Sequence, residues 1–126
     1  ERWVIEPTAR IVSALRTKYP DVPIIGFPRG AGPLYQRYIE AIDVQGVSVD
    51  ETISPSWARD HLQSKVTVQG NVDSFALMAG GDALKAQVEG VMEAWSKGPY
   101  VFNLGHGIQQ FTPVAHVEQM LKWVRG

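Results

Sequence analysis

The chain contains no cysteine among its 126 residues. This absence excludes disulfide bonds, thiolate zinc sites and cysteine nucleophiles. No apolar run approaches the ~20 residues that a membrane-spanning helix needs. Neither sign of charge dominates, because the formal net charge is −1. A nucleic-acid-binding surface or a polybasic membrane-binding surface is therefore not indicated.

The composition that is present, 44% hydrophobic and 20% charged residues, is ordinary for a soluble globular protein. The length fits a single domain, residues 1–126, or a part of a larger one. No stretch has the composition of a linker, and Glu1 to Val4 do not have the layout of a signal peptide. We therefore expect a soluble cytoplasmic protein that binds neither membranes nor nucleic acid.

The hydrophobic period alternates along the chain between that of strands and that of helices. Short apolar runs predict strands at residues 22–27, 46–50, 66–70 and 100–104. Apolar residues three or four apart predict helices at residues 3–19, 33–42, 54–62, 74–78, 80–95 and 114–124. The expected apolar faces of three of them are Ile11, Val12 and Leu15; Leu34, Tyr38 and Ile42; and Leu84, Val88, Val91 and Trp95.

One helix followed by four strand–helix units indicates a parallel sheet with helical crossovers. Four such strands could stand alone as a doubly wound sheet, whereas a complete (β/α)8 barrel needs ~250 residues. Each strand is followed by a polar or glycine-rich segment, and parallel strands bring these segments to one rim, as in a barrel. We therefore predict an α/β fold that is half of a (β/α)8 barrel. The rim segments are Arg29-Gly30-Ala31-Gly32, Asp50-Glu51-Thr52, Gln69-Gly70-Asn71-Val72-Asp73 and Gly105-His106-Gly107.

His106 is the strongest single candidate for a functional residue. It follows the apolar run 100–104 and lies between two glycines, which let the backbone turn and leave the imidazole uncovered. The alternative is a structural histidine that is hydrogen-bonded at a strand end. His61 lies late in a helix, where a cation suits the helix dipole, and His116 lies in the first turn of the last helix. For both of these we expect solvated surface positions.

Three of the charged rim residues are further candidates. Arg29 is the only arginine of the four segments, and a guanidinium group binds a carboxylate through two N–H groups, although a solvated loop arginine is the alternative. Asp50 and Asp73 both follow strands and could form a carboxylate pair. We favour Asp73 as the N-cap of the turn that begins at Ser74, and nothing in the sequence fixes the direction of Asp50. No phosphate-binding loop of the GxGxxG or GxxxxGK[ST] type is present.

Three of these segments closely resemble the uroporphyrinogen decarboxylase family. They are residues 22–27 with the glycine-rich loop that follows, Val66-Thr67-Val68-Gln69-Gly70-Asn71-Val72-Asp73, and Phe102-Asn103-Leu104-Gly105-His106-Gly107-Ile108. The last two match the family in order, spacing and strand context. The resemblance runs through all 126 residues and implies the C-terminal half of the family's barrel, four βα units preceded by a helix.

The resemblance implies a cofactor-free carboxy-lyase of haem and porphyrin biosynthesis. Such an enzyme removes the four acetate carboxyls of uroporphyrinogen, a tetrapyrrole, and gives coproporphyrinogen. In the family, the histidine of the Leu-Gly-His-Gly motif lines the active-site cleft, and this role passes to His106 as the catalytic residue. Arg29, Gly105 and Gly107 are the candidates for substrate binding, and no metal ligand is expected.

The family's substrate-binding arginines, its pyrrole-binding aspartate and its active-site tyrosine lie in the N-terminal half, and none has a counterpart here. We therefore expect the isolated chain to be inactive. Its expected partner is the missing half of the barrel or, in a homodimer, a second copy. Imidazole titrates near neutrality, so His106 could donate a proton, accept one or bind a substrate carboxylate. We favour carboxylate binding together with proton transfer.

Two alternative functions remain at this point. The chain could be a non-catalytic half-barrel that associates with itself, because an open four-stranded sheet exposes two edges and one face. It could also resemble the zinc-dependent methyltransferases that share this fold and act on corrinoids or coenzyme M. Those enzymes hold zinc with cysteine thiolates, which this chain lacks.

Overall fold

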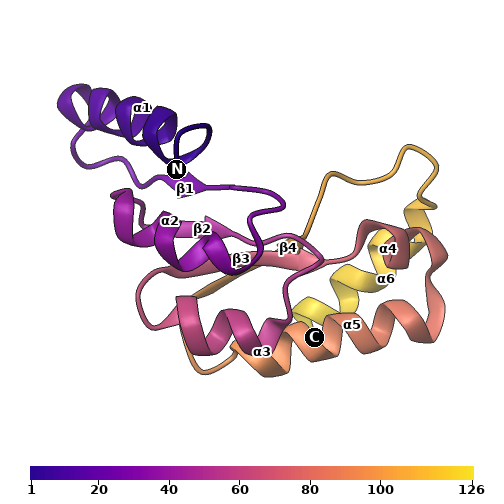
Figure 1. Ribbon diagram of the computed structural model, residues 1–126. Helices are drawn as coiled ribbons and strands as arrows, with labels where there is room; N and C mark the ends of the chain where they lie inside the picture. The colour runs from indigo at the N-terminus through magenta and orange to yellow at the C-terminus, as the bar shows by residue number, and fades with distance from the viewer.

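The computed structural model describes residues 1–126 and contains one sheet of four parallel strands (Figure 1). The strands are β1 (Ile25–Gly26), β2 (Gly46–Ser48), β3 (Thr67–Val72) and β4 (Tyr100–Leu104), and they lie in the order β1-β2-β3-β4. Each strand therefore pairs with the next one along the chain. A doubly wound sheet reverses its strand order at a switch point, whereas a barrel winds in one direction. The observed order is that of a barrel.

The helices follow the same progression as the strands. Neighbouring helices contact one another in chain order, from α1 with α2 through α3 with α5 to α5 with α6. This arrangement corresponds to part of the outer helical ring of a barrel. The fold predicted from the sequence, a partial (β/α)8 barrel, is confirmed. The helical elements are α1 (Ile5–Lys18), the 3₁₀ turn η1 (Gly32–Leu34), α2 (Tyr35–Ala41), α3 (Pro55–Ala58), the π-helical segment η2 (Arg59–Gln63), α4 (Ser74–Ala79), α5 (Gly81–Trp95) and α6 (Val114–Arg125).

The core lies between the sheet and the helices. Val47 and Val68 are aligned in neighbouring strands and are fully buried. The α5 face predicted from the sequence is confirmed, because Leu84, Val88, Val91 and Trp95 are all buried. Burying each such side chain stabilises the fold by roughly 1.5–3 kcal/mol. The helices are thus held on one face of the sheet by apolar contact.

The other face of the sheet, which we call the inner face, is open. Ile25, Phe27 and Val101 lie on or beside the strands and are between 42% and 48% exposed. Strand alternation explains this division, since Val101 neighbours Tyr100 and Phe102, which pack against the core. The chain therefore carries one buried sheet face and one face on which several apolar side chains remain exposed.

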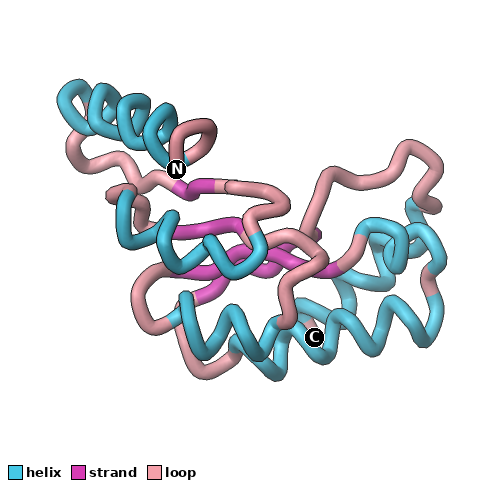
Figure 2. Tube along the Cα trace, viewed as in Figure 1, coloured by secondary structure: helices cyan, strands magenta, loops and turns pink.

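Two predicted helical faces are only partly buried. Ile11 and Leu15 of α1 are 61% and 42% exposed, although Val12 is buried. Leu34 is 59% exposed, because Pro33 and Leu34 form the 3₁₀ turn η1 before α2 begins at Tyr35. Figure 2 shows α1 at one end of the molecule, and α2 is the helix that it contacts. Ile5 and Ala9 of α1 pack against the core, whereas Ile11 and Leu15 remain largely exposed. None of the helices is long and apolar enough to cross a membrane.

Candidate active site at the carboxyl ends of the strands

The rim segments meet where the strands end. The backbone N–H of Gly105 donates to the Val72 carbonyl at 2.8 Å, so the β3–β4 pairing continues one residue beyond β4. Gly105 also lies against the turn that follows β2. A Cβ at this position would clash with the Glu51 backbone nitrogen and lie 2.9 Å from the Asp50 carbonyl carbon. This close approach requires glycine at position 105 and brings His106 next to the Asp50–Glu51 turn.

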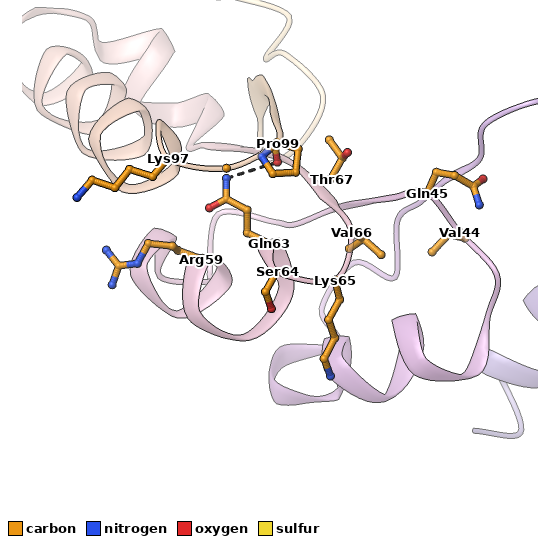
Figure 3. Close-up of a pocket in the computed structure, with 11 residues that line it drawn as sticks. Val44, Gln45, Arg59, Gln63, Ser64, Lys65, Val66, Thr67, Lys97 and Pro99 are labelled. Carbon is orange, nitrogen blue, oxygen red and sulfur yellow. Dashed lines mark hydrogen bonds between the residues drawn. The ribbon is translucent and has the colours of Figure 1, made fainter.

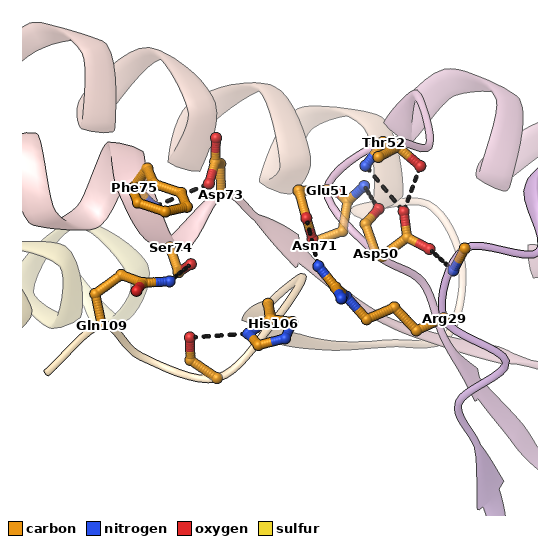
Figure 4. Close-up of polar contacts among 12 residues, drawn as sticks. Arg29, Asp50, Glu51, Thr52, Asn71, Asp73, Ser74, Phe75, His106 and Gln109 are labelled. Atoms are coloured by element: carbon orange, nitrogen blue, oxygen red, sulfur yellow. Dashed lines mark hydrogen bonds and ion pairs between the residues drawn. The ribbon is translucent and has the colours of Figure 1, made fainter.

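His106 is solvent-exposed and lines a cavity of about 390 Å³ on the inner face. Its Nδ1 lies 3.3 Å from the Gly107 carbonyl oxygen, and no other hydrogen bond holds the ring (Figure 4). The Nε2 side of the imidazole is therefore free for a ligand. The other residues that line this cavity are Phe27, Ser48, Gln69, Asn103, Leu104, Gly107 and Ile108.

Arg29 forms an ion pair across the rim. Its Nη2 lies 3.3 Å from Glu51 Oε1, and the arginine side chain remains 52% exposed (Figure 4). Gly105 packs on the Glu51 backbone, so this ion pair and His106 belong to the same part of the rim. A single carboxylate contact leaves further guanidinium N–H groups free. Arg29 can therefore bind an additional anion while it stays paired with Glu51.

Asp50 is the most densely hydrogen-bonded residue of the rim and is only 1% exposed. Its carboxylate accepts hydrogen bonds from Gly30 N at 2.8 Å, Tyr35 Oη at 2.9 Å and Thr52 N at 3.0 Å, and also from the Thr52 hydroxyl. Burial alone would raise the pKa of Asp50, but the bonds from Thr52, Gly30 and Tyr35 hold that pKa below its usual value. Burial and the Asp50 contact raise the pKa of the Tyr35 hydroxyl. Asp50 therefore anchors the glycine-rich loop as a carboxylate.

Asn71 ties β3 to the same turn. Its Nδ2 donates to the Asp50 carbonyl oxygen at 3.0 Å and to the Ile53 carbonyl oxygen at 2.6 Å, and the side chain is buried. The preceding Gly70 has φ +133°, and a Cβ there would clash with the Val49 carbonyl oxygen. The sequence did not predict that Gly70 and Asn71 organise the site. The Gln69-Gly70-Asn71 run predicts a tight loop, and nothing in it indicates a contact between strands.

The acidic and histidine positions outside this cluster have structural partners. Asp73 is the N-cap of α4, as predicted, because its Oδ1 accepts from Phe75 N at 2.8 Å. His61 stacks on Trp57, with ring centroids 4.6 Å apart. The expectation of a solvated His116 is wrong. Its Nδ1 lies 3.1 Å from both the Leu77 and the Met78 carbonyl oxygens, at the C-terminal end of α4.

The largest cavity lies at the opposite end of the sheet and has a different character. It measures about 740 Å³ and opens between residues that precede β2, β3 and β4 (Figure 3). Gln63 is buried there and donates to the Trp95 carbonyl oxygen at 2.8 Å. Arg59 and Lys65 are paired with Asp60 and Glu40. Lys97 lies in the same lining, so this cavity carries three cationic side chains and no acidic one.

No group of three or more His, Asp and Glu side chains is placed to hold a metal ion. The rim offers one free imidazole, the Arg29 guanidinium paired with Glu51, the hydrogen-bonded Asp50 carboxylate and several neutral hydrogen-bond donors. This set suits recognition of a carboxylate and transfer of a proton.

The winding of the strands defines an α/β barrel segment whose candidate site residues lie at the carboxyl ends of the strands. The chain belongs to the uroporphyrinogen decarboxylase family, whose model matches residues 1–126. It is 52% identical over 126 residues to a uroporphyrinogen decarboxylase of Novosphingobium aromaticivorans and 50% identical to one of Sphingopyxis alaskensis. These matches cover all of this chain and 37% of each relative. A relative from Caulobacter vibrioides is 48% identical, with 36% of its length matched.

The Gly105 contact predicts a steric effect on stability. Gly105→Ala forces the β4 end away from the Asp50–Glu51 backbone and is expected to lower the free energy of unfolding by about 1–3 kcal/mol. Gly107→Ala is the matched control, because nothing lies within 4 Å of its Cβ position; its effect is expected to stay within about 0.5 kcal/mol. Urea unfolding of the two variants measures the difference. Equal stability of both would contradict the close approach.

The Asp50 cluster predicts a pH-dependent stability. Because the folded-state pKa of Asp50 is lowered, its contribution is present above the unfolded-state pKa of ~3.9 and is lost as pH falls through the folded-state pKa. Asp50→Asn is expected to cost about 1–3 kcal/mol at pH 7 and progressively less at acid pH. Urea unfolding at pH 7 and near pH 3 measures this, with the exposed Asp21→Asn as the control. A loss that is independent of pH would show that the carboxylate charge is not the stabilising feature.

Proposed function

We propose that this chain forms the His106-bearing part of a uroporphyrinogen decarboxylase and acts in the porphyrin biosynthesis of the cytoplasm. The observation that carries the proposal is the position of His106. It stands at the end of β4 in the Leu104-Gly105-His106-Gly107 motif, uncovered, on a cavity of the inner face. The Asn103–Ile108 segment and the 52% identity to a relative of that name support the same reaction.

The proposed reaction breaks the bond between an acetate methylene and its carboxylate. Protonation of the pyrrole ring supplies the electron sink, carbon dioxide leaves, and a proton takes its place, so that each acetate becomes a methyl group. The electron pair of the broken bond forms a double bond between the methylene carbon and the ring, which neutralises the protonated pyrrole. A proton then adds to the methylene carbon, and the ring releases the proton that it received at the start, so that one proton is consumed for each carbon dioxide released. The step needs no oxidant and no reductant. The chain's part in it is to bind carboxylates and to hold or move a proton at His106 Nε2.

Binding of the substrate is assigned to the rim around His106. Arg29 offers guanidinium N–H groups to a carboxylate while it stays paired with Glu51. Gly105 and Gly107 bring the backbone close to the cavity and leave room for a ring beside the imidazole. A tetrapyrrole that carries acetate and propionate on each pyrrole needs more cations than Arg29 alone. The isolated chain is therefore expected to be inactive.

We further propose that the inner face is covered by the other strands of the barrel in the complete enzyme. The supporting observation is the exposure of Ile25, Phe27 and Val101 on that face. Without those strands, a second copy can pair with the free edge of β1 or β4 and cover the same apolar side chains. A homodimer of the chain is the second form that this surface favours.

The catalytic assignment is tested in a chimera in which residues 1–126 replace the matching segment of the Novosphingobium aromaticivorans relative. His106→Ala is expected to lower kcat/KM for uroporphyrinogen by ~10²–10⁴-fold, the usual contribution of a positioned acid or base. Arg29→Gln is expected to raise KM about tenfold by removing a charged hydrogen bond. His61→Ala is the control, because His61 stacks on Trp57 away from the cavity. An active chimera with unchanged kinetics in His106→Ala would overturn the role of this histidine.

The exposed inner face predicts self-association of the isolated chain. Multi-angle light scattering after size-exclusion chromatography is expected to give a mass above that of one 13.9 kDa chain. The chimera, in which the other barrel strands cover the same face, provides the comparison. A clean monomer of the isolated chain would contradict pairing through the open sheet.

A further inference from the structure

The cavity beside His106 has an unusual chemical lining for a site that receives an anionic substrate. None of the eight residues that line it is Asp, Glu, Lys or Arg. Polar side chains come from three neighbouring strands: Ser48 of β2, Gln69 of β3 and Asn103 of β4. Apolar walls are formed by Phe27 and Ile108. The cavity is thus polar without being charged, apart from the imidazole at its edge.

The hydrogen bonds within this cavity leave donors free. Asn103 Oδ1 accepts from the Leu104 backbone N–H at 2.8 Å, which orients the amide and leaves Nδ2 to donate. Ser48 Oγ accepts from Gln69 Nε2 at 3.3 Å, which leaves the serine hydroxyl hydrogen free. No bond to Asn103 Nδ2 is present within the chain. These free donors and the His106 ring line one cavity.

We propose that Asn103 and Ser48, together with His106, form a subsite that holds one carboxylate-bearing arm of the substrate through neutral donors. The inference rests on the proposed function and adds residues and a mode of recognition to it. N–H and O–H donors bind a carboxylate oxygen through charge-assisted hydrogen bonds. The apolar walls of Phe27 and Ile108 suit the methylene group and the edge of the pyrrole ring.

The absence of a cation from this subsite has a chemical consequence. A carboxylate that leaves as carbon dioxide loses its negative charge, so an ion pair to arginine would stabilise the reactant more than the transition state. Neutral donors orient the carboxylate with less of this stabilisation. The cationic Arg29, which stands outside the cavity lining, suits arms that keep their charge. The subsite therefore fits the reacting acetate.

The decisive variant is Asn103→Asp in the same chimera. The new side chain keeps the shape and the oxygen that accepts from Leu104 N–H, but it replaces the free donor by a negatively charged acceptor. Uroporphyrin, the oxidised and unreactive form of the substrate, is titrated by fluorescence. Its dissociation constant is expected to rise at least about tenfold, since a charge-assisted hydrogen bond is lost and two carboxylates face each other. Ser48→Ala, which deletes one hydroxyl, is expected to give a smaller rise.

Gln119→Glu on the exposed side of α6 adds the same charge away from the cavity and serves as the control. The proposal is overturned if Asn103→Asp and Gln119→Glu bind uroporphyrin equally well, or if Ser48→Ala and Asn103→Ala both leave the affinity unchanged. The two alanine variants decide the matter if Asn103→Asp does not fold. Turnover separates the two proposals: a chimera that binds but does not decarboxylate contradicts the proposed function, while the binding data still judge the subsite.

Discussion

The buried carboxylate of Asp50 is the interaction on which the arrangement of the rim depends. It stands at the end of β2 and accepts hydrogen bonds from Gly30, Tyr35 and Thr52. An unpaired charge at 1% exposure would cost several kcal/mol, so these donors must remain in place for the fold to persist. The glycine-rich loop, and Arg29 with it, is therefore fixed to β2. Asn71 of β3 donates a hydrogen bond to the backbone of the same turn, and Gly105, which follows β4, packs against that backbone. All four strands are thereby connected at the edge that bears His106.

The two edges of the sheet illustrate how one topology separates stability from chemistry. At the amino ends of the strands, Arg59 and Lys65 are paired with carboxylates and Gln63 bonds to backbone carbonyls. Gln63 is buried and joins this edge to the end of α5. At the carboxyl ends, His106 makes one weak contact, and Arg29 one ion pair. Helices begin on this second edge, so their dipoles favour negative charge there. The helix dipoles therefore favour an anionic ligand at the second edge.

The sequence was sufficient for features that depend on local pattern. The four strands, the buried face of α5 and the Asp73 cap follow from hydrophobic period and from the short reach of a capping side chain. Features that depend on distant partners were not accessible. Strand β2 is only three residues long, so alternation could not tell whether Asp50 faces the cavity or the loop. His116 bonds to carbonyls 38 and 39 residues away, which no local pattern encodes. The exposure of Ile11 and Leu15 likewise depends on what packs beside α1.

The open inner face connects these observations to function. Phe27 and Val101 are exposed on this face. Leaving apolar surface in water costs roughly 25 cal/mol per Å², so covering these side chains would stabilise the protein. The same face carries the polar side chains of Ser48, Gln69 and Asn103. Burying their donors in an apolar core without hydrogen-bond partners would cost free energy. A surface with apolar walls and free polar groups is suited to the interior of a barrel that receives a ligand, where other strands cover the apolar part and the ligand satisfies the donors. The exposed apolar side chains and the free donors of the inner face therefore lie on the same open side of the sheet.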